Sequence, residues 1–180
     1  MSKKLLKINL FDGGKSLQNA IRTIEQYRDD LPRKAQQLCQ RLSEIGEQTA
    51  LVAISESPQG KAVTLRVDIN PSKIGCQAMI IGTGKTVTDE KGRTFNLLFG
   101  IEFGSGITLN PTENPLSSDF GMGVGTFPDQ VHAFDKGGWM YLGQDGEWHR
   151  SYGVKSTMPF YKAMNSIRQN LDKVVKEVFA

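Results

Sequence analysis

The chain has 180 residues, of which 38% are hydrophobic and 23% are charged, and its net charge at neutral pH is +3. This length and balance are typical of one domain, residues 1–180, and exclude a disordered or collagen-like chain. No run approaches the roughly 18 apolar residues of a membrane span, and Met1–Phe11 lacks a signal peptide's apolar core and cleavage site. We therefore expect no membrane partner and synthesis in the cytoplasm.

The small net charge hides an uneven distribution along the chain. Residues 1–100 carry a net charge of +5, residues 101–149 carry −6, and residues 150–180 carry +4. Glycine, proline and aromatic residues also gather in the acidic stretch. The sequence therefore predicts an acidic insert between two basic flanks.

The first third of the chain predicts one short strand and two helices. Residues 4–11 are rich in strand formers, and apolar residues then recur at helical spacing to about residue 29, with Ser16 as a plausible cap. Pro32 is tolerated only in a first helical turn, so we expect a second helix capped by Asp29 or Asp30. Its apolar face continues to Ala53, with Gly46 as a mild interior fault.

The middle of the chain has the alternation of strands. Residues 62–69, 75–81 and 94–103 read as three strands of an antiparallel meander, the first ended by Asn70-Pro71. Residues 104–137 have no period and are rich in glycine and proline, which predicts a long loop that is functional or mobile.

A tight hairpin and a helix complete the predicted α+β fold. The Asp-Gly pair at 145–146 marks a turn between residues 138–142 and 147–149. An apolar stripe then follows Pro159, which predicts a C-terminal helix capped by Ser156 or Thr157. We expect a small antiparallel sheet packed against the N-terminal and C-terminal helices, with the Gly/Pro-rich loop outside.

The best candidate for nucleotide chemistry is the run Gly82-Thr83-Gly84-Lys85-Thr86. A phosphate-binding loop also requires a glycine at position 79, where this chain has Met79, and a helix after Thr86, where a turn is predicted. A glycine-rich strand end is the better interpretation. Nucleotide hydrolysis through Lys85 remains the third and weakest hypothesis for this chain.

The sequence offers no convincing catalytic or metal site. The two histidines, His132 and His149, lack a cysteine or second histidine at ligand spacing. The loop aspartates do not have EF-hand spacing, and Cys39 and Cys76 have neither a CxxC spacing nor a disulfide pattern, so we expect reduced, packed thiols. We expect no catalytic residues, no metal and no cofactor.

Three motifs in order resemble the neck or tail-component proteins of long-tailed double-stranded DNA bacteriophages. The first is Ile101–Ile107 (IEFGSGI), where the family has Glu-aromatic-Gly-Thr/Ser-Gly. The second is Gly138–Tyr141 (GWMY) with an Asp-Gly turn and Trp148. The third is Gly153–Phe160 (GVKSTMPF), which resembles the family's Gly, small residues and Pro-Phe before a terminal helix, although the insert after Gly106 is unusually long.

The resemblance implies a non-enzymatic structural protein of the virion neck, active in head-tail joining or tail completion. Its partners would be other phage neck and tail proteins and further copies of itself in an oligomeric ring, through which DNA can pass without sequence-specific binding. We place the candidate interface at nine residues of the motifs and insert: Glu102, Phe103, Gly104, Gly106, Asp119, Phe120, Phe127, Trp139 and Trp148. For Trp139, Trp148 and Phe160, core packing is the first interpretation and a contact between subunits the alternative.

A nucleic-acid-binding regulator is the alternative function from a different class. Its basis is the basic N-terminal third and the isoelectric point of about 8.8. The cations of the helical region are, however, mixed with carboxylates, which favours a solvated helix face.

Overall fold

One long helix, α1 (Lys15–Ser55), organises the molecule. The computed structural model describes residues 7–9, 11–88, 92, 94–106, 114–121, 135–143 and 145–179. The carboxylate of Asp12 accepts the N–H groups of Gly14 (3.1 Å) and Ser16 (2.8 Å) at the start of α1. The Ser16 hydroxyl bonds the backbone of Asn9 instead, so the prediction that Ser16 caps the helix was wrong.

The prediction of two helices broken near Pro32 was also wrong, because Pro32 lies inside α1. A proline in a helix interior removes one hydrogen bond and costs about 3 kcal/mol. A break would instead create two new helix ends, each with four backbone groups that lack an intrahelical partner. Continuing the helix through Pro32 therefore disrupts fewer backbone hydrogen bonds than interrupting it.

A β-hairpin follows α1 after a turn of 3-10 helix, η1 (Gly60–Ala62). The strands β1 (Val63–Ser72) and β2 (Gly75–Gly84) pair antiparallel, in a register that places Val63 opposite Gly84 and Ser72 opposite Gly75. Their positions confirm the first two predicted strands, although Pro71 is within β1 rather than after it.

The third predicted strand is wrong over most of its length. Only β4 (Thr94–Asn96) is extended, and it pairs with β3 (Thr86–Thr88), whereas the apolar run that follows forms α2 (Leu97–Phe103). The side chain of Asn96 accepts the N–H of Leu98 at 2.9 Å and so caps this helix. The strands consequently form separate two-stranded sheets rather than one meander.

The C-terminal part has a short 3-10 helix, a hairpin and a helix. These elements are η2 (Ser118–Phe120), β5 (Trp139–Leu142), β6 (Trp148–Ser151) and α3 (Pro159–Phe179). The last three confirm the predicted hairpin and C-terminal helix. The predicted strand at residues 4–11 and the predicted loop at 104–137 lie largely outside the described residues, and Lys7–Asn9 form no strand.

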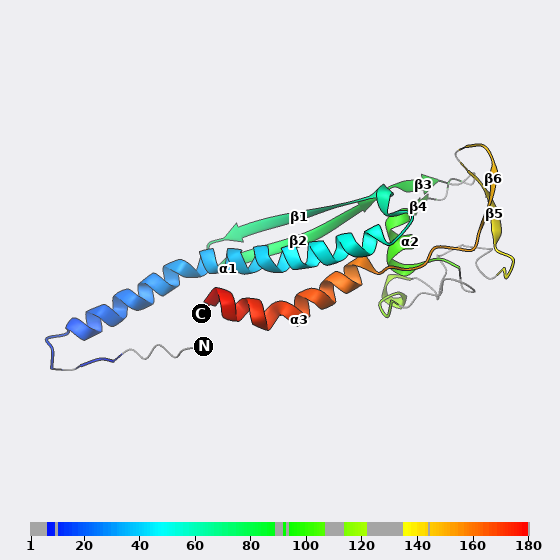
Figure 1. Cartoon of the computed structure of the whole chain (residues 1–180). Coiled ribbons are helices and arrows are strands. Elements are labelled where there is room, and N and C mark those ends of the chain that lie inside the picture. The colour runs from blue at the N-terminus through cyan, green and yellow to red at the C-terminus, as the bar shows by residue number, and fades with distance from the viewer. Residues whose placement is uncertain are drawn as a thin grey trace.

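The β1–β2 hairpin and α3 both run along the C-terminal half of α1, whereas β5 and β6 lie at one end of the molecule (Figure 1). The elements confirm the predicted α+β fold with small antiparallel sheets. Close packing explains why α1 has a glycine at position 46. A Cβ atom at Gly46 would lie 2.6 Å from side-chain atoms of both Ile80 and Ile167. The missing side chain lets the three elements converge on one another.

Candidate functional site: the Glu102 junction and two uncovered apolar surfaces

The first and third sequence motifs meet in space. The backbone N–H of Ser105 donates to the carbonyl of Val154 at 2.8 Å, and the N–H of Val154 donates back to the Ser105 carbonyl at 3.1 Å. The carbonyl of Ile101 accepts the N–H of Thr157 at 2.9 Å. We call residues 101–106 and 153–161 together the Glu102 junction. It ties the end of α2 to the start of α3.

The carboxylate of Glu102 lies at the centre of this junction and is buried. One of its oxygens accepts the N–H of Phe160 at 2.8 Å, and the other accepts the N–H of Tyr161 at 3.0 Å and the side-chain amide of Asn114 at 2.8 Å. Burial raises the pKa of Glu102 above its ordinary value, while these three donors pull the pKa downwards. Glu102 thus caps α3 from 58 residues away in sequence.

This arrangement corrects the predicted cap of the last helix. The hydroxyl of Thr157 is buried and has no hydrogen-bond partner among the described residues, so it does not cap α3. A carboxylate at a helix N-terminus satisfies backbone N–H groups that would otherwise lack partners and is favoured by the helix dipole. The sequence signal was available in the glutamate of the IEFGSGI motif, but pattern alone could not show what the carboxylate faces.

Glycine is required where the two segments of the junction cross. Gly104, Gly106 and Gly153 all have positive φ, the last at 102°. A Cβ atom at Gly153 would lie 1.9 Å from the carbonyl oxygen of Ser105. An L-residue at this position would therefore both strain the backbone and displace the opposite segment.

The other predicted interface residues of the insert are partly described. Phe103 is buried, and its ring centroid lies 5.5 Å from that of Phe120 in η2. Asp119 and Phe120 are exposed, so both can contact another molecule. Phe127 lies outside the described residues.

The β5–β6 hairpin presents an uncovered apolar surface. The register pairs Met140 with Arg150 and Leu142 with Trp148, so Met140, Leu142 and Trp148 share one face, which we call the hairpin surface. Trp148 is 67% exposed, and core packing is therefore wrong as an interpretation of this residue. Trp139 lies on the opposite face and is half-buried.

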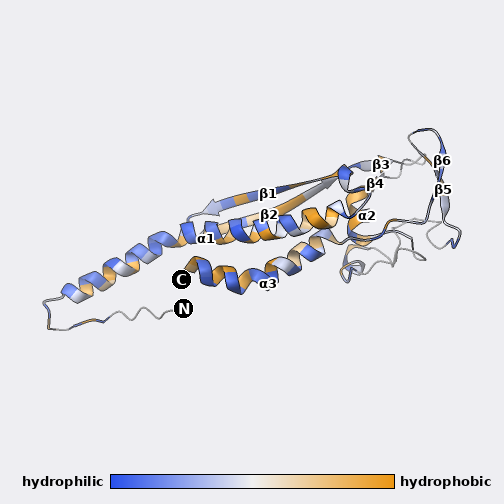
Figure 2. Cartoon of the chain, viewed as in Figure 1, coloured by the Kyte–Doolittle hydropathy of each residue, from blue (hydrophilic) through white to orange (hydrophobic). Residues whose placement is uncertain are grey.

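The N-terminal half of α1 carries a second uncovered surface. It extends past the β1–β2 turn and the C-terminal end of α3 (Figure 1), with apolar and polar residues mixed along it (Figure 2). Five large side chains at helical spacing remain 37–58% exposed, and we call them the α1 stripe: Leu17, Ile21, Ile24, Tyr27 and Leu31. The spacing predicted an amphipathic helix correctly, but the apolar side is not covered by the described part of this chain.

The glycine-rich run near Lys85 is a strand end, as the sequence favoured. Gly82 and Gly84 belong to β2, and the N–H of Lys85 donates to the Ala62 carbonyl at 2.9 Å before β3 begins. The strand β3 follows this run directly, where a phosphate-binding loop would have a helix. His149 bonds the carboxylate of Asp145 at 2.8 Å on the exposed hairpin, and His132 is outside the described residues.

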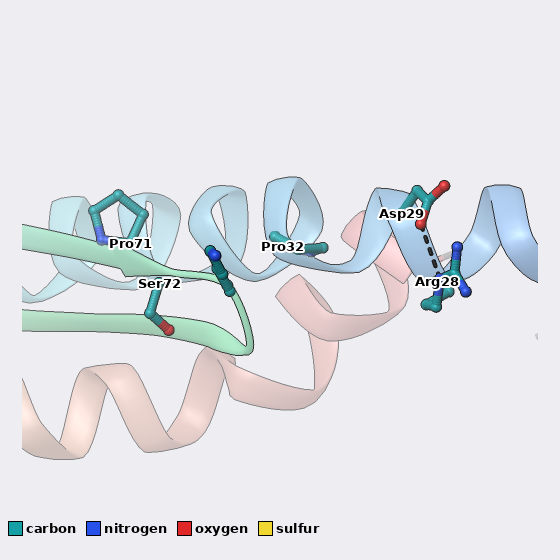
Figure 3. A pocket seen from close by; sticks show the side chains of 6 residues that line it. Arg28, Asp29, Pro32, Pro71 and Ser72 are labelled. Carbon is teal, nitrogen blue, oxygen red and sulfur yellow. Dashed lines mark hydrogen bonds and ion pairs between the residues drawn. The ribbon is translucent and has the colours of Figure 1, made fainter.

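Three arginines of α1 are paired with carboxylates. Arg28 pairs with Asp29 at 2.9 Å, Arg33 pairs with Asp30 at 3.1 Å, and Arg41 pairs with Glu177. An open groove where α1 passes the β1–β2 turn is lined by Arg28, Asp29, Pro32, Pro71, Ser72 and Lys73 (Figure 3). Its mixed charges and two prolines do not favour an extended anion.

Sequence reasoning missed Asn114 and the pairing of Ser105 with Val154. Asn114 is buried and also accepts the N–H of Leu116 at 3.0 Å, so it fixes a turn while it bonds Glu102. The Asn-Pro pair at 114–115 was a turn signal, but not one that pointed to a partner.

No protein-family model, curated protein or solved structure matches the chain. In the described part of the chain, no helix is both long enough and apolar enough to cross a membrane. Within the same residues, no three His, Cys, Asp or Glu side chains gather as metal ligands would.

Proposed function

We propose that this chain is a non-enzymatic structural protein of a phage virion, placed in the neck between the head and the tail. It would be made in the host cytoplasm and assemble into a ring with copies of itself and with other neck and tail proteins. The observation that carries the proposal is the pair of uncovered apolar surfaces, the α1 stripe and the hairpin surface, at opposite ends of the molecule.

Large exposed apolar patches on a protein mark surfaces that another molecule covers. The α1 stripe belongs to a helix whose C-terminal half is packed against β2 and α3. The apolar side of α1 therefore runs along the whole helix, but these elements bury it only in the C-terminal half. A component of a larger assembly has this property, because its neighbours complete the burial.

The Glu102 junction supports a scaffold role rather than a reaction. Both oxygens of the Glu102 carboxylate are already engaged by the N–H groups of α3 and by Asn114. The three motifs behind the phage resemblance also gather at one end: the first and third form the junction, and the second contributes to the β5–β6 hairpin. The junction would hold the hairpin and the insert in place for contacts with neighbours.

The test is genetic. Negative-stain microscopy of lysates from a phage that lacks this gene should show heads and tails that are not joined. Normal infectious particles in these lysates would overturn the proposal. Complementation should then fail with the double variant Ile21→Lys/Ile24→Lys. The matched control is Asn19→Lys/Gln26→Lys, which adds the same charge to the opposite, exposed side of the same helical turns and should restore infectivity.

A further inference from the structure

The chain has two cysteines, and the fold brings them together. Cys39 lies on α1 and Cys76 lies on β2, 37 residues further along the chain. The thiol of Cys39 donates to the backbone carbonyl of Cys76, with 3.2 Å between the sulfur and the oxygen. Both thiols are free and half-buried, so neither is closed off from solvent.

The pattern of side chains places both cysteines on the facing sides of α1 and β2. Ile80 of β2 points at Gly46 of α1, because a Cβ atom at Gly46 would lie 2.6 Å from the Ile80 side chain. Cys76 is four residues before Ile80 and so shares its face of the strand. Cys39 is about two helical turns before Gly46 and so shares its face of the helix. Since α1 and β2 run in the same direction (Figure 1), the two cysteines lie opposite one another.

The distances between the two residues suit a disulfide bond. The carbonyl oxygen of Cys76 is at most about 2.8 Å from the Cα atom of the same residue, which places the Cys39 sulfur within about 6 Å of that Cα atom. A disulfide joins residues whose Cα atoms are about 4.4–6.8 Å apart. Rotation of the two side chains, with at most a small approach of α1 to β2, therefore brings the sulfurs into bonding distance.

We propose that Cys39 and Cys76 form an intramolecular disulfide when the protein meets a low-molecular-weight disulfide oxidant, and remain thiols while reducing agents are in excess. The bridge joins α1 to the β1–β2 hairpin at a point between Gly46 and the α1 stripe, close to the β1–β2 turn. It therefore anchors the base of the half of α1 that extends past that turn (Figure 1). This inference is independent of the proposed neck function, because it concerns two residues of one chain.

The reaction is thiol–disulfide exchange, here with oxidised glutathione as the oxidant. The Cys76 thiolate attacks one glutathione sulfur, the S–S bond of the oxidant breaks, and one glutathione thiolate leaves. The Cys39 thiolate then attacks the Cys76 sulfur of this mixed disulfide, and the second glutathione thiolate leaves. The protein thiols lose the electron pair that reduces the oxidant, and their protons end on the two glutathione thiolates. Cys39 acts second, because burial and the hydrogen bond with the Cys76 thiol raise the pKa of Cys39 to about 11 and keep it protonated.

Mass spectrometry of the purified full chain tests the bridge. After incubation with oxidised glutathione, the intact chain should lose about 2 Da, and a digest without reductant should contain a peptide pair that joins Cys39 to Cys76. A chain that carries only glutathione adducts, forms only disulfide-linked dimers or stays fully reduced would overturn the proposal.

The unfolded chain is the control for proximity. A bridge that fits the fold stabilises it, so the equilibrium constant for closing the bridge against glutathione should be at least about tenfold larger in buffer than in urea. The oxidised chain should accordingly melt about 5–10 °C above the reduced chain, because the bridge restricts the unfolded state more than the folded one. Equal constants, or an oxidised chain that melts below the reduced chain, would show that the fold does not hold the cysteines in position to bond and would overturn the proposal.

Cys39→Ser and Cys76→Ser are the matched variants, since each removes one sulfur and keeps a side chain of similar size. Neither should show the rise in melting temperature with oxidised glutathione. The same rise in a single variant would mean that glutathione stabilises the chain without the bridge, which contradicts the proposal. The peptide map of the wild type decides the question even where a variant does not fold.

Discussion

Removing the carboxylate of Glu102 should destabilise the whole C-terminal half of the fold. Glu102→Ala leaves the N–H groups of Phe160 and Tyr161 and the amide of Asn114 without their acceptor. A buried donor that loses its partner costs about 1–3 kcal/mol. Because Phe160 and Tyr161 are only half-buried, water can replace part of the loss, and the substitution also relieves the desolvation of a buried charge.

These opposing contributions give a net loss of about 2–4 kcal/mol in the free energy of unfolding. For a chain of this size each kcal/mol lowers the melting temperature by about 2–4 °C, so we expect a decrease of about 5–15 °C. Urea unfolding followed by circular dichroism measures the free energy, and a thermal melt measures the temperature.

The matched control is Glu56→Ala. Glu56 is exposed, and its carboxylate lies 3.4 Å from the Lys162 ammonium, so this change should alter stability by less than about 1 kcal/mol. If Glu102→Ala and Glu56→Ala melt at the same temperature, the claim that Glu102 caps α3 is refuted.

Four further experiments test other features of the molecule. Burial raises the pKa of Glu102 above its ordinary value of about 4.5. The contribution of this shift to the free energy of unfolding is therefore complete below pH 4.5 and is lost as the pH rises through the raised pKa. Urea titrations should show the wild type losing stability relative to Glu102→Gln over that pH range. Gly153→Ala should cost at least about 1–3 kcal/mol from its positive φ, whereas Gly137→Ala, with open space around it, should melt like the wild type. Burial raises the pKa of the Cys39 thiol to about 11, so at pH 8 mass spectrometry should find that iodoacetamide alkylates Cys39 more slowly in the folded chain than after unfolding in urea. Ile24→Lys should change the unfolding free energy by less than about 0.5 kcal/mol, since Ile24 is exposed; a larger loss by urea titration would mean that this chain covers the α1 stripe itself.

The elements with a clear period were predictable from the sequence. The alternation in β1, the Asp-Gly turn at residues 145–146 and the apolar stripe after Pro159 each depend on nearby residues, and each prediction is confirmed. The local pattern predicted the wrong element where one apolar run fits both the period of a strand and the period of a helix. Residues 97–103 suit either a strand or a helix, and the choice depends on the Asn96 side chain and on the position of α3.

The junction was less predictable because its contacts join residues far apart in the chain. The glycines of IEFGSGI indicated a sharp exit from regular structure, but their reason is the closeness of residues 153–156. The apolar spacing of residues 17–31 indicated an amphipathic helix, yet spacing cannot show what covers the apolar side. Both failures concern tertiary neighbours, which single-sequence patterns do not encode.

The unbroken course of α1 also fixes an angle. Because each residue turns the helix by about 100°, the direction in which the α1 stripe points is locked to the packed half near Gly46. One residue inserted before Pro32 would rotate the stripe by about 100° and lengthen the rod by only about 1.5 Å, whereas seven residues would preserve its direction and add about 10 Å. The helix therefore sets both the direction of the α1 stripe and its distance from the packed half, for whatever binds its free end.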